Sequence, residues 1–237
     1  MYLNNELVTE LIIPDSVTRI NYRAFNKCTS LTSVTIGNSV TTIGNCAFEG
    51  CTGITNVTIP NSVTTIGTSA FKGCTGLTNI TIPNSVTSIA YQAFCGAGLT
   101  SIEIPGGITN MDIEIFRECR SLQSVVLSNS LTSISNGTFY RCYALTELII
   151  PDSIINIGNN SIQECTSLVS ITIPDSVTSM GSDVFRGDSK LEFVQLSNNL
   201  TSLGNNLFRD CSSLKSITLP NKINTIGNYS FTECSSL

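Results

Sequence analysis

Residues 54–76 read ITNVTIPNSVTTIGTSAFKGCTG, and this stretch recurs with small changes along the chain. Self-similarity at a fixed period of roughly 20 to 50 residues is typical of stacked-repeat architectures. The sequence therefore predicts one domain, 1–237, with ten coils over residues 8–236. Nine rows have 23 residues and the fourth has 22; they begin at Val8, Leu31, Ile54, Leu77, Leu99, Leu122, Leu145, Leu168, Leu191 and Leu214.

Two short extended segments are expected in each row. The first six places are rich in Ile, Val and Thr and alternate apolar with polar residues, which indicates a strand with one buried face. Proline follows in seven of the ten rows, as at Pro60, and ends the strand because it cannot donate to a ladder. A second extended piece spans residues 62–66. The inward places of this row are Ile54, Val57, Ile59, Val63 and Ile66.

The rest of the row should turn the chain back toward the next strand. Six rows close the second segment with glycine, where we expect a positive φ, and the following Ala-Phe segment is long enough only for a 3-10 or single-turn helix. No row can bury its own apolar edge, so neighbouring rows should pair their strands in parallel around a shared core. The six glycines are Gly44, Gly67, Gly158, Gly181, Gly204 and Gly227.

The rows resemble the BspA-like, Treponema-type leucine-rich repeat, an LxxLxLP segment followed by LxxIxxxAFxxCxx. The resemblance covers residues 8–237 and implies a β-rich α/β fold, a right-handed solenoid with a parallel sheet on its concave face. Leucine at the first place of eight rows favours this over a straighter parallel β-helix. The departures are Ser161 and Ile162 in place of Ala-Phe, Asp188 in place of Cys, and a residue lost near Ala97.

The same resemblance implies cell-surface or secreted proteins that take part in adhesion, without catalytic residues. The N-terminus, Met1 to Leu7, has no signal-peptide pattern, and no run of eighteen apolar residues predicts a membrane span. Because the chain stops directly after the tenth row, we expect a fragment or a chain without its C-terminal cap.

Composition narrows the function classes. Charged residues make up only 12% of the chain, the net charge is −5, and no basic stripe could neutralise phosphates, so nucleic acid is not an expected partner. The absence of histidine removes Ser-His-Asp and Cys-His nucleophile systems. The nearest carboxylate pairs, Asp112 with Glu114 and Asp183 with Asp188, are expected on solvated turns. The sequence predicts no enzyme, cofactor or metal site.

Eight of the ten cysteines share one place in the repeat, three residues after the Phe or its substitute. This regularity favours buried free thiols over disulfides between coils or zinc, since no CxxC pair is present. Cys46 and Cys95 fall outside this ladder and are the better candidates for exposed, reactive thiols. The ladder comprises Cys28, Cys51, Cys74, Cys119, Cys142, Cys165, Cys211 and Cys234.

The second, third and fifth places of each row form one exposed surface, called here the sheet face, because repeat proteins bind partners on such extended surfaces. In the first half these places hold mostly Thr, Ser and Asn, which solubility alone would explain. In the second half, apolar residues rimmed by polar ones are typical of a partner-binding patch, although random drift of a surface strand is the alternative. The candidate binding residues are Val126, Glu147, Ile149, Val169, Glu192, Phe193 and Gln195.

Two hypotheses follow. The first is a non-enzymatic binding or adhesion module whose sheet face engages a protein or glycoprotein, without direct insertion into a membrane. The second is a structural spacer that displays another domain and has no ligand of its own.

Overall fold

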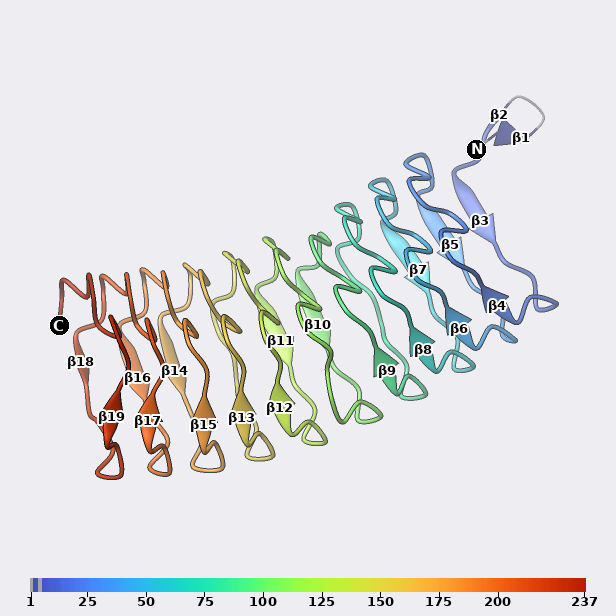
Figure 1. Cartoon of the computed structure of the whole chain (residues 1–237). Coiled ribbons are helices and arrows are strands. Elements are labelled where there is room, and N and C mark those ends of the chain that lie inside the picture. The colour runs from blue at the N-terminus through green and yellow to red at the C-terminus, as the bar shows by residue number, and fades with distance from the viewer. Residues whose placement is uncertain (1, 4–5) are drawn as a thin grey trace.

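The computed structural model describes residues 2–3 and 6–237, and it stacks the rows as successive coils along one axis (Figure 1). Residues 1, 4 and 5 lie outside the described part, although they belong to the expected domain and to the N-terminal stretch searched for a signal. Before the first coil, Tyr2–Leu3 (β1) and Glu6–Leu7 (β2) pair as a short antiparallel hairpin.

Two series of parallel strands follow the predicted places, but both are shorter than expected. The first comprises β3 Glu10–Ile12, β5 Ser33–Thr35, β7 Asn56–Thr58, β10 Ser101–Glu103, β11 Ser124–Val126, β14 Ser170–Thr172, β16 Phe193–Gln195 and β18 Ser216–Ile217. The second comprises β4 Arg19–Ile20, β6 Thr42–Ile43, β8 Thr65–Ile66, β9 Ser88–Ile89, β12 Ser133–Ile134, β13 Asn156–Ile157, β15 Ser179–Met180, β17 Ser202–Leu203 and β19 Thr225–Ile226. Equivalent places pair in register, as Val34 does with Val57.

Neither series forms an unbroken sheet. The first divides into β3-β5-β7, β10-β11 and β14-β16-β18, and the second into β4-β6-β8-β9, β12-β13-β15 and β17-β19. The interruptions in the first series fall at coils 4 and 7, whose described residues contain no strand at this place. Strand pairing therefore cannot be what joins every coil to the next.

The Ala-Phe segment supplies the continuous connection. In the first coil, the N–H groups of Arg23, Phe25 and Lys27 donate to carbonyls of the second coil, and three such bonds of 2.7 to 3.3 Å recur at all nine steps between coils. The N–H groups between them close local turns onto the carbonyl three residues earlier, as Asn26 does onto Arg23. We call this segment the turn spine. The predicted 3-10 or helical turn is wrong for the described residues, because alternate N–H groups leave the coil.

The predicted positive φ at the six closing glycines is also wrong. None of them has a positive φ. A Cβ on Gly67 would lie 2.6 Å from Asn45 Oδ1 and 2.8 Å from the Gly44 carbonyl carbon, so glycine is needed there because the preceding coil approaches closely. Positive φ occurs instead at the sixteenth and twentieth places, in the turn spine, as at Ser69 (φ 54°) and Gly73 (φ 69°). Fifteen of these residues are not glycine, and none of the fifteen is β-branched.

The core consists of columns in which each coil contributes the same place. Phenylalanines stack with ring centroids 5.3 to 6.0 Å apart, and apolar side chains from both strand series fill the rest of the interior. The column is interrupted once, because Ile162 stands between Phe139 and Phe185. It therefore forms two stacks, one through coils 1–6 and one through coils 8–10.

The cysteine ladder faces inward. Its thiols are unpaired with one another, and from the second coil onward each donates to the carbonyl of the preceding coil's Phe at 3.0 to 3.3 Å. Burial raises the pKa of the Cys51 thiol to about 11. Cys28 and Cys234, in the terminal coils, are only half-buried.

The expectation of exposed, reactive thiols at Cys46 and Cys95 is wrong. Cys95 is buried, because its coil is closed by the neighbouring turns on both sides, and burial raises its pKa. Cys46 is half-exposed, but partial burial and then the nearby Glu49 carboxylate raise its pKa. A thiol held protonated is a poor nucleophile.

The one carboxylate within the ladder is fully buried, which corrects the expectation of a solvated turn. Asp188 Oδ1 accepts the N–H of Cys165 at 2.8 Å, and Oδ2 has no partner. Buried hydroxyls of Ser153, Ser161 and Ser176 also lack partners in coils 7 and 8. Buried oxygens without hydrogen-bond partners are therefore concentrated in coils 7 and 8, next to the interruption of the Phe column and of the first strand series.

Candidate binding face

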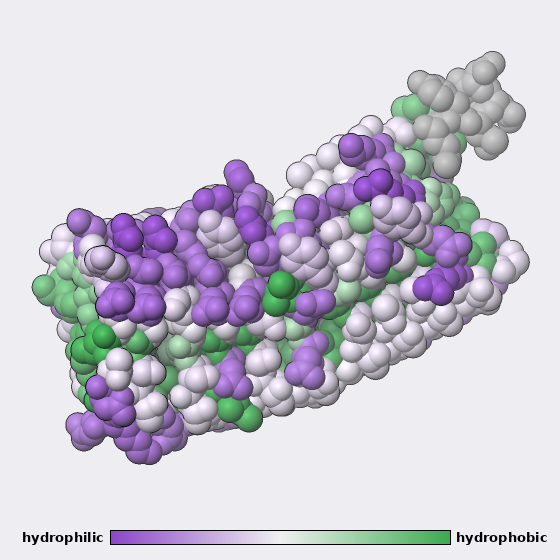
Figure 2. Space-filling view, viewed as in Figure 1, coloured by the Kyte–Doolittle hydropathy of each residue, from purple (hydrophilic) through white to green (hydrophobic). Residues whose placement is uncertain are grey.

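The hydroxyl ladder of the N-terminal coils serves the backbone. Thr32 Oγ1 donates to the carbonyl of Thr9 at 3.0 Å, and Thr55 Oγ1 donates to that of Thr32 at 3.2 Å. A hydroxyl has a single proton to donate, so these threonines have already committed theirs to the preceding coil. In Figure 2, much of the surface over these coils is white, between hydrophilic and hydrophobic. The threonines at the second place of these coils therefore have a structural role.

The apolar residues that replace hydroxyl side chains on the sheet face are exposed, as their places in the repeat predict. Val126 in β11 and Ile149 in coil 7 occupy the fifth place of adjacent coils and are 60% and 69% exposed. Although coil 7 has no strand here, the N–H of Thr146 donates to the Gln123 carbonyl at 3.3 Å. This bond keeps the register that sets Ile149 beside Val126. Glu147 is exposed on the same segment.

A second apolar group lies two coils further on. Phe193 is 51% exposed, and its N–H lies 3.4 Å from the carbonyl of the exposed Val169 in the preceding coil. The Lys215 ammonium lies 5.3 Å from the Phe193 ring centroid and pairs with Glu192 at 2.5 Å. The apolar members thus form two groups, Val126 and Ile149 at the fifth place of coils 6 and 7, and Val169 and Phe193 at the second and third places of coils 8 and 9.

The second group borders a groove of about 340 Å³. It opens because β16 and β18 pair only from Phe193 to Val194, so the strands separate beyond this point. Gln195 lies along this groove, and Phe193 stands at its start. An aromatic side chain beside a groove with amide and hydroxyl groups is a common anchor for a protein partner. The other lining residues are Val194, Leu196, Asn198, Ser216, Ile217, Thr218 and Pro220.

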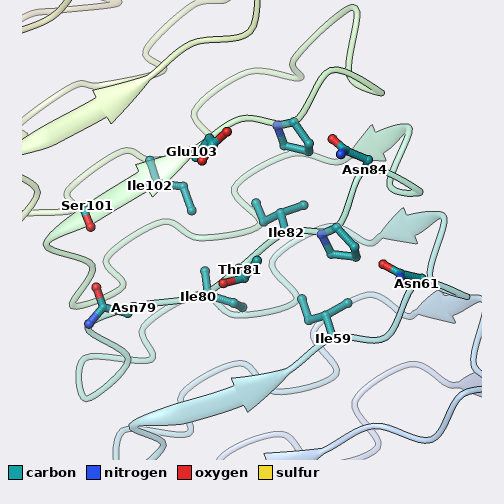
Figure 3. Close-up of a pocket in the computed structure, with 12 residues that line it drawn as sticks. Ile59, Asn61, Asn79, Ile80, Thr81, Ile82, Asn84, Ser101, Ile102 and Glu103 are labelled. Atoms are coloured by element: carbon teal, nitrogen blue, oxygen red, sulfur yellow. The ribbon is translucent and has the colours of Figure 1, made fainter.

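A larger groove, about 540 Å³, lies at coil 4 (Figure 3). Residues 79–82 run between β7 and β10 without forming a strand, and Ile80 is only half-buried although its counterparts Val57 and Ile102 are buried. The shortened coil of the sequence is this one. Its lining of Asn, Thr, Ile and one carboxylate, Glu103, provides no aromatic anchor.

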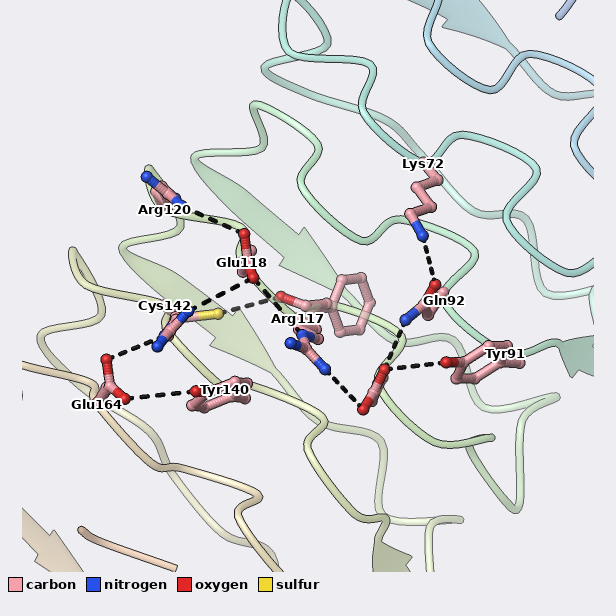
Figure 4. Close-up of polar contacts among 12 residues, drawn as sticks. Lys72, Tyr91, Gln92, Arg117, Glu118, Arg120, Tyr140, Cys142 and Glu164 are labelled. Carbon is pink, nitrogen blue, oxygen red and sulfur yellow. Dashed lines mark hydrogen bonds and ion pairs between the residues drawn. The ribbon is translucent and has the colours of Figure 1, made fainter. Parts of the chain in front are cut away.

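Sequence reasoning missed a charged network on the turn spine of the middle coils, 3 to 7 (Figure 4). Glu114 accepts hydrogen bonds from Gln92 at 2.6 Å and Arg117 at 2.9 Å. Partial burial raises its pKa, but these hydrogen bonds and the guanidinium charge outweigh burial, and the pKa lies below its ordinary value. Tyr140 is flanked by Arg117 and Arg141, whose guanidinium carbons lie 4.9 and 4.8 Å from its ring centroid.

This network joins coils to one another. Arg141 in coil 6 pairs with Glu164 of coil 7 at 3.0 Å, and its guanidinium lies 3.9 Å from the carboxylate of Glu118 in coil 5. The charged residues of this network occupy the sixteenth, nineteenth and twentieth places of their rows. They are far apart in the sequence, so only an alignment of the rows could have predicted that they meet. Because these groups already have partners, the turn spine is less suited to binding than the sheet face.

No catalytic arrangement emerges among the described residues. Asp183 pairs with Arg186 at 3.3 Å, and its expected neighbour Asp188 is inside the core. Asp112 accepts the N–H of Tyr91 at 3.0 Å, while Glu114 belongs to the charged network. The described part contains no cluster of three or more metal-ligating side chains and no helix long and apolar enough to cross a membrane.

Comparisons with known proteins agree with the repeat pattern. The sequence profile for the BspA type leucine rich repeat region, which holds six copies, matches residues 1–123 and 109–237. A leucine rich cell surface protein from Faecalibacterium prausnitzii shares 26% identity with a TM-score of 0.57, over 97% of this chain and 78% of that one. The T. pallidum leucine rich repeat protein shares 27% with a TM-score of 0.65, over 69% and 79%.

A leucine-rich repeat protein from Bacteroides ovatus has the same fold, with a TM-score of 0.61 and 24% identity over 96% of this chain and 85% of that one. The names of these three structures denote no enzyme. A comparison with curated protein sequences gave no match.

Proposed function

The chain belongs to the BspA type leucine rich repeat family, and on that premise we propose that it is a non-enzymatic adhesion or binding module that engages a protein or glycoprotein through its sheet face. The chain has a leucine-rich-repeat fold of the kind found in a bacterial cell surface protein, as its family and structural likeness show. The specific binding role is our inference.

One observation carries the proposal: Phe193 and Ile149 are large apolar side chains, half or more exposed, on the C-terminal half of the sheet face. Exposing them costs solvation free energy that burial against a partner would recover, at about 25 cal/mol per Å² of apolar area. The Phe193 backbone is paired with both neighbouring coils in β16, so little ordering entropy would be lost there on binding.

A cell-surface or secreted location is part of the proposal. Its support is the Faecalibacterium prausnitzii relative, which is described as a cell surface protein. The spacer hypothesis remains the second candidate, favoured by the N-terminal coils, where the threonine hydroxyls are already bonded to the preceding coil.

The test compares affinities after a partner has been isolated. Extracellular proteins captured on the immobilised chain are identified, and the dissociation constant of the strongest is measured by biolayer interferometry for Phe193→Ser, Ile149→Thr and the control Thr58→Ser. We expect at least about a tenfold loss for Phe193→Ser, since aromatic residues dominate interface energetics, and none for the control. Equal constants in all three variants, with unchanged circular dichroism, would contradict binding through these residues.

A further inference from the structure

Charge on the sheet face is strongly one-sided. Its second, third and fifth places hold four carboxylates, Glu10, Glu103, Glu147 and Glu192, and a single cation, Lys215. The chain has 12 Lys and Arg residues in all, so eleven lie on other surfaces. Lys215 already pairs with Glu192, which leaves the middle of the face acidic.

Two of these carboxylates flank the first apolar group. Glu103 is the register partner of Val126 in the neighbouring strand, and Glu147 precedes Ile149 by two residues on the same side of the chain. Adjacent strands lie about 4.8 Å apart and alternate residues about 6.7 Å apart, so all four positions fall within roughly 12 Å. Among the described residues, neither carboxylate has a cation within 4.0 Å.

We infer that the sheet face of coils 5–7 binds an extended, basic segment of a partner protein, in which an aliphatic side chain covers Val126 and Ile149 while neighbouring Lys or Arg side chains pair with Glu103 and Glu147. This rests on the proposed function and names the chemistry of its partner. Along an extended segment, side chains on one face recur at about 6.7 Å, so two basic residues on either side of an aliphatic one are about 13 Å apart. This is close to the roughly 12 Å that the strand spacing gives between Glu103 and Glu147. An acidic partner would place like charges together.

Three capped synthetic peptides of equal length test the inference. In each, Ser occupies every second residue and the residues between are alternately Lys and Val, Glu and Val, or Lys and Ser, so that both kinds of side chain lie on one face of the extended peptide. They are called the Lys-Val, Glu-Val and Lys-Ser peptides. Dissociation constants come from amide chemical shifts of the isotopically labelled chain, which also map the site. The Lys-Val peptide is expected to bind at least about fivefold more tightly than either of the others. Its affinity should fall as salt rises from low to high concentration, because exposed ion pairs are screened.

Variants separate charge from apolar contact. Glu103→Gln with Glu147→Gln should weaken Lys-Val binding about threefold to tenfold, as expected for two exposed ion pairs. Asp152→Asn removes an exposed carboxylate of coil 7 that lies off the sheet face, and should leave binding unchanged. Glu103→Lys with Glu147→Lys should reverse the preference toward the Glu-Val peptide. Circular dichroism checks that each variant is folded.

The outcomes distinguish this inference from the proposed function. Equal binding of Lys-Val and Glu-Val, or equal losses in the glutamine variants and in Asp152→Asn, overturns the charge inference. If Val126→Thr with Ile149→Thr still weakens binding in that case, the proposed function stands. Shifts that map away from the sheet face, with no effect of any sheet-face variant, overturn both.

Discussion

Replacing Asp188 by cysteine should stabilise the chain and remove a pH dependence. Burial raises the pKa of Asp188 well above its ordinary value, and the charge of Glu164 adds to this, while the N–H of Cys165 opposes it. A buried oxygen without a partner costs about 1 to 3 kcal/mol. Cysteine restores the repeat residue, whose thiol donates to a carbonyl of the preceding coil in the other coils. We therefore expect the free energy of unfolding to rise by about that amount at low pH, where the carboxyl is neutral in both states, and by more at pH 7.

The sign of the pH dependence follows from the two states. The carboxyl of Asp188 holds its proton in the folded chain and releases it in the unfolded chain once the pH exceeds its ordinary pKa of 3.8. The stabilising contribution is complete below that pKa and falls as the pH rises toward the folded-state pKa. Between the two pKa values the slope is about 1.4 kcal/mol per pH unit, so raising the pH from 5 to 7 should destabilise the parent chain relative to the cysteine variant.

Urea unfolding followed by far-ultraviolet circular dichroism, under reducing conditions at pH 5 and pH 7, measures both effects. Asp188→Asn keeps the shape of the side chain without a titrating group, and should share the flat pH response of the cysteine variant. Asp152→Asn, on the surface, should keep the response of the parent chain. Parallel pH responses of the parent chain and Asp188→Cys would refute the argument that a neutral carboxyl is held inside coil 8.

Three further results are expected. Phe71→Ala, which removes a ring from the middle of a stack, should cost about 3 to 5 kcal/mol, and hydrogen exchange should quicken first in the third coil; unchanged exchange there would contradict inward packing. Gly73→Ala should cost about 1 to 2 kcal/mol for its positive φ alone, whereas Gly67→Ala should cost more, because its Cβ would strike the preceding coil; equal losses in urea unfolding would be inconsistent with that clash. At neutral pH a soluble disulfide reagent should label Cys46 and the terminal-coil thiols slowly and leave Cys95 unlabelled until urea is added; prompt labelling of Cys95 would exclude its burial.

The repeat period alone was enough to predict the register of the fold. Once the rows are aligned, the inward columns, the ladder of thiols and the sheet face follow, because every coil must present the same places to its neighbours. The same alignment placed Ile149 and Phe193 on the exposed face. The binding role of these residues stays a prediction.

Contacts between coils account for what the sequence did not predict. Within a single row, Gly67 suggests a positive φ. Only the adjacent coil shows that glycine is needed because a Cβ would clash with that coil. Ser69 has a positive φ although it is not glycine, so the residue type did not predict this conformation. Asp188 and Asp183, five residues apart, look like a surface pair, but the place that Asp188 occupies in the repeat is inward. The sequence of one row therefore predicts a residue's conformation and burial least well where these depend on contact with the neighbouring coil.

The turn spine gives the stack a net dipole along its axis. All of its inter-coil N–H groups point toward the following coil, so the peptide dipoles align along the axis as they do in a helix, whereas strand dipoles alternate and largely cancel. The first coil carries Arg23 and Lys27 in this segment and the tenth carries Glu233, the signs of charge that such a dipole favours. A coil inserted into the stack would have to enter with the same polarity, because a reversed coil would set carbonyl against carbonyl and amide against amide.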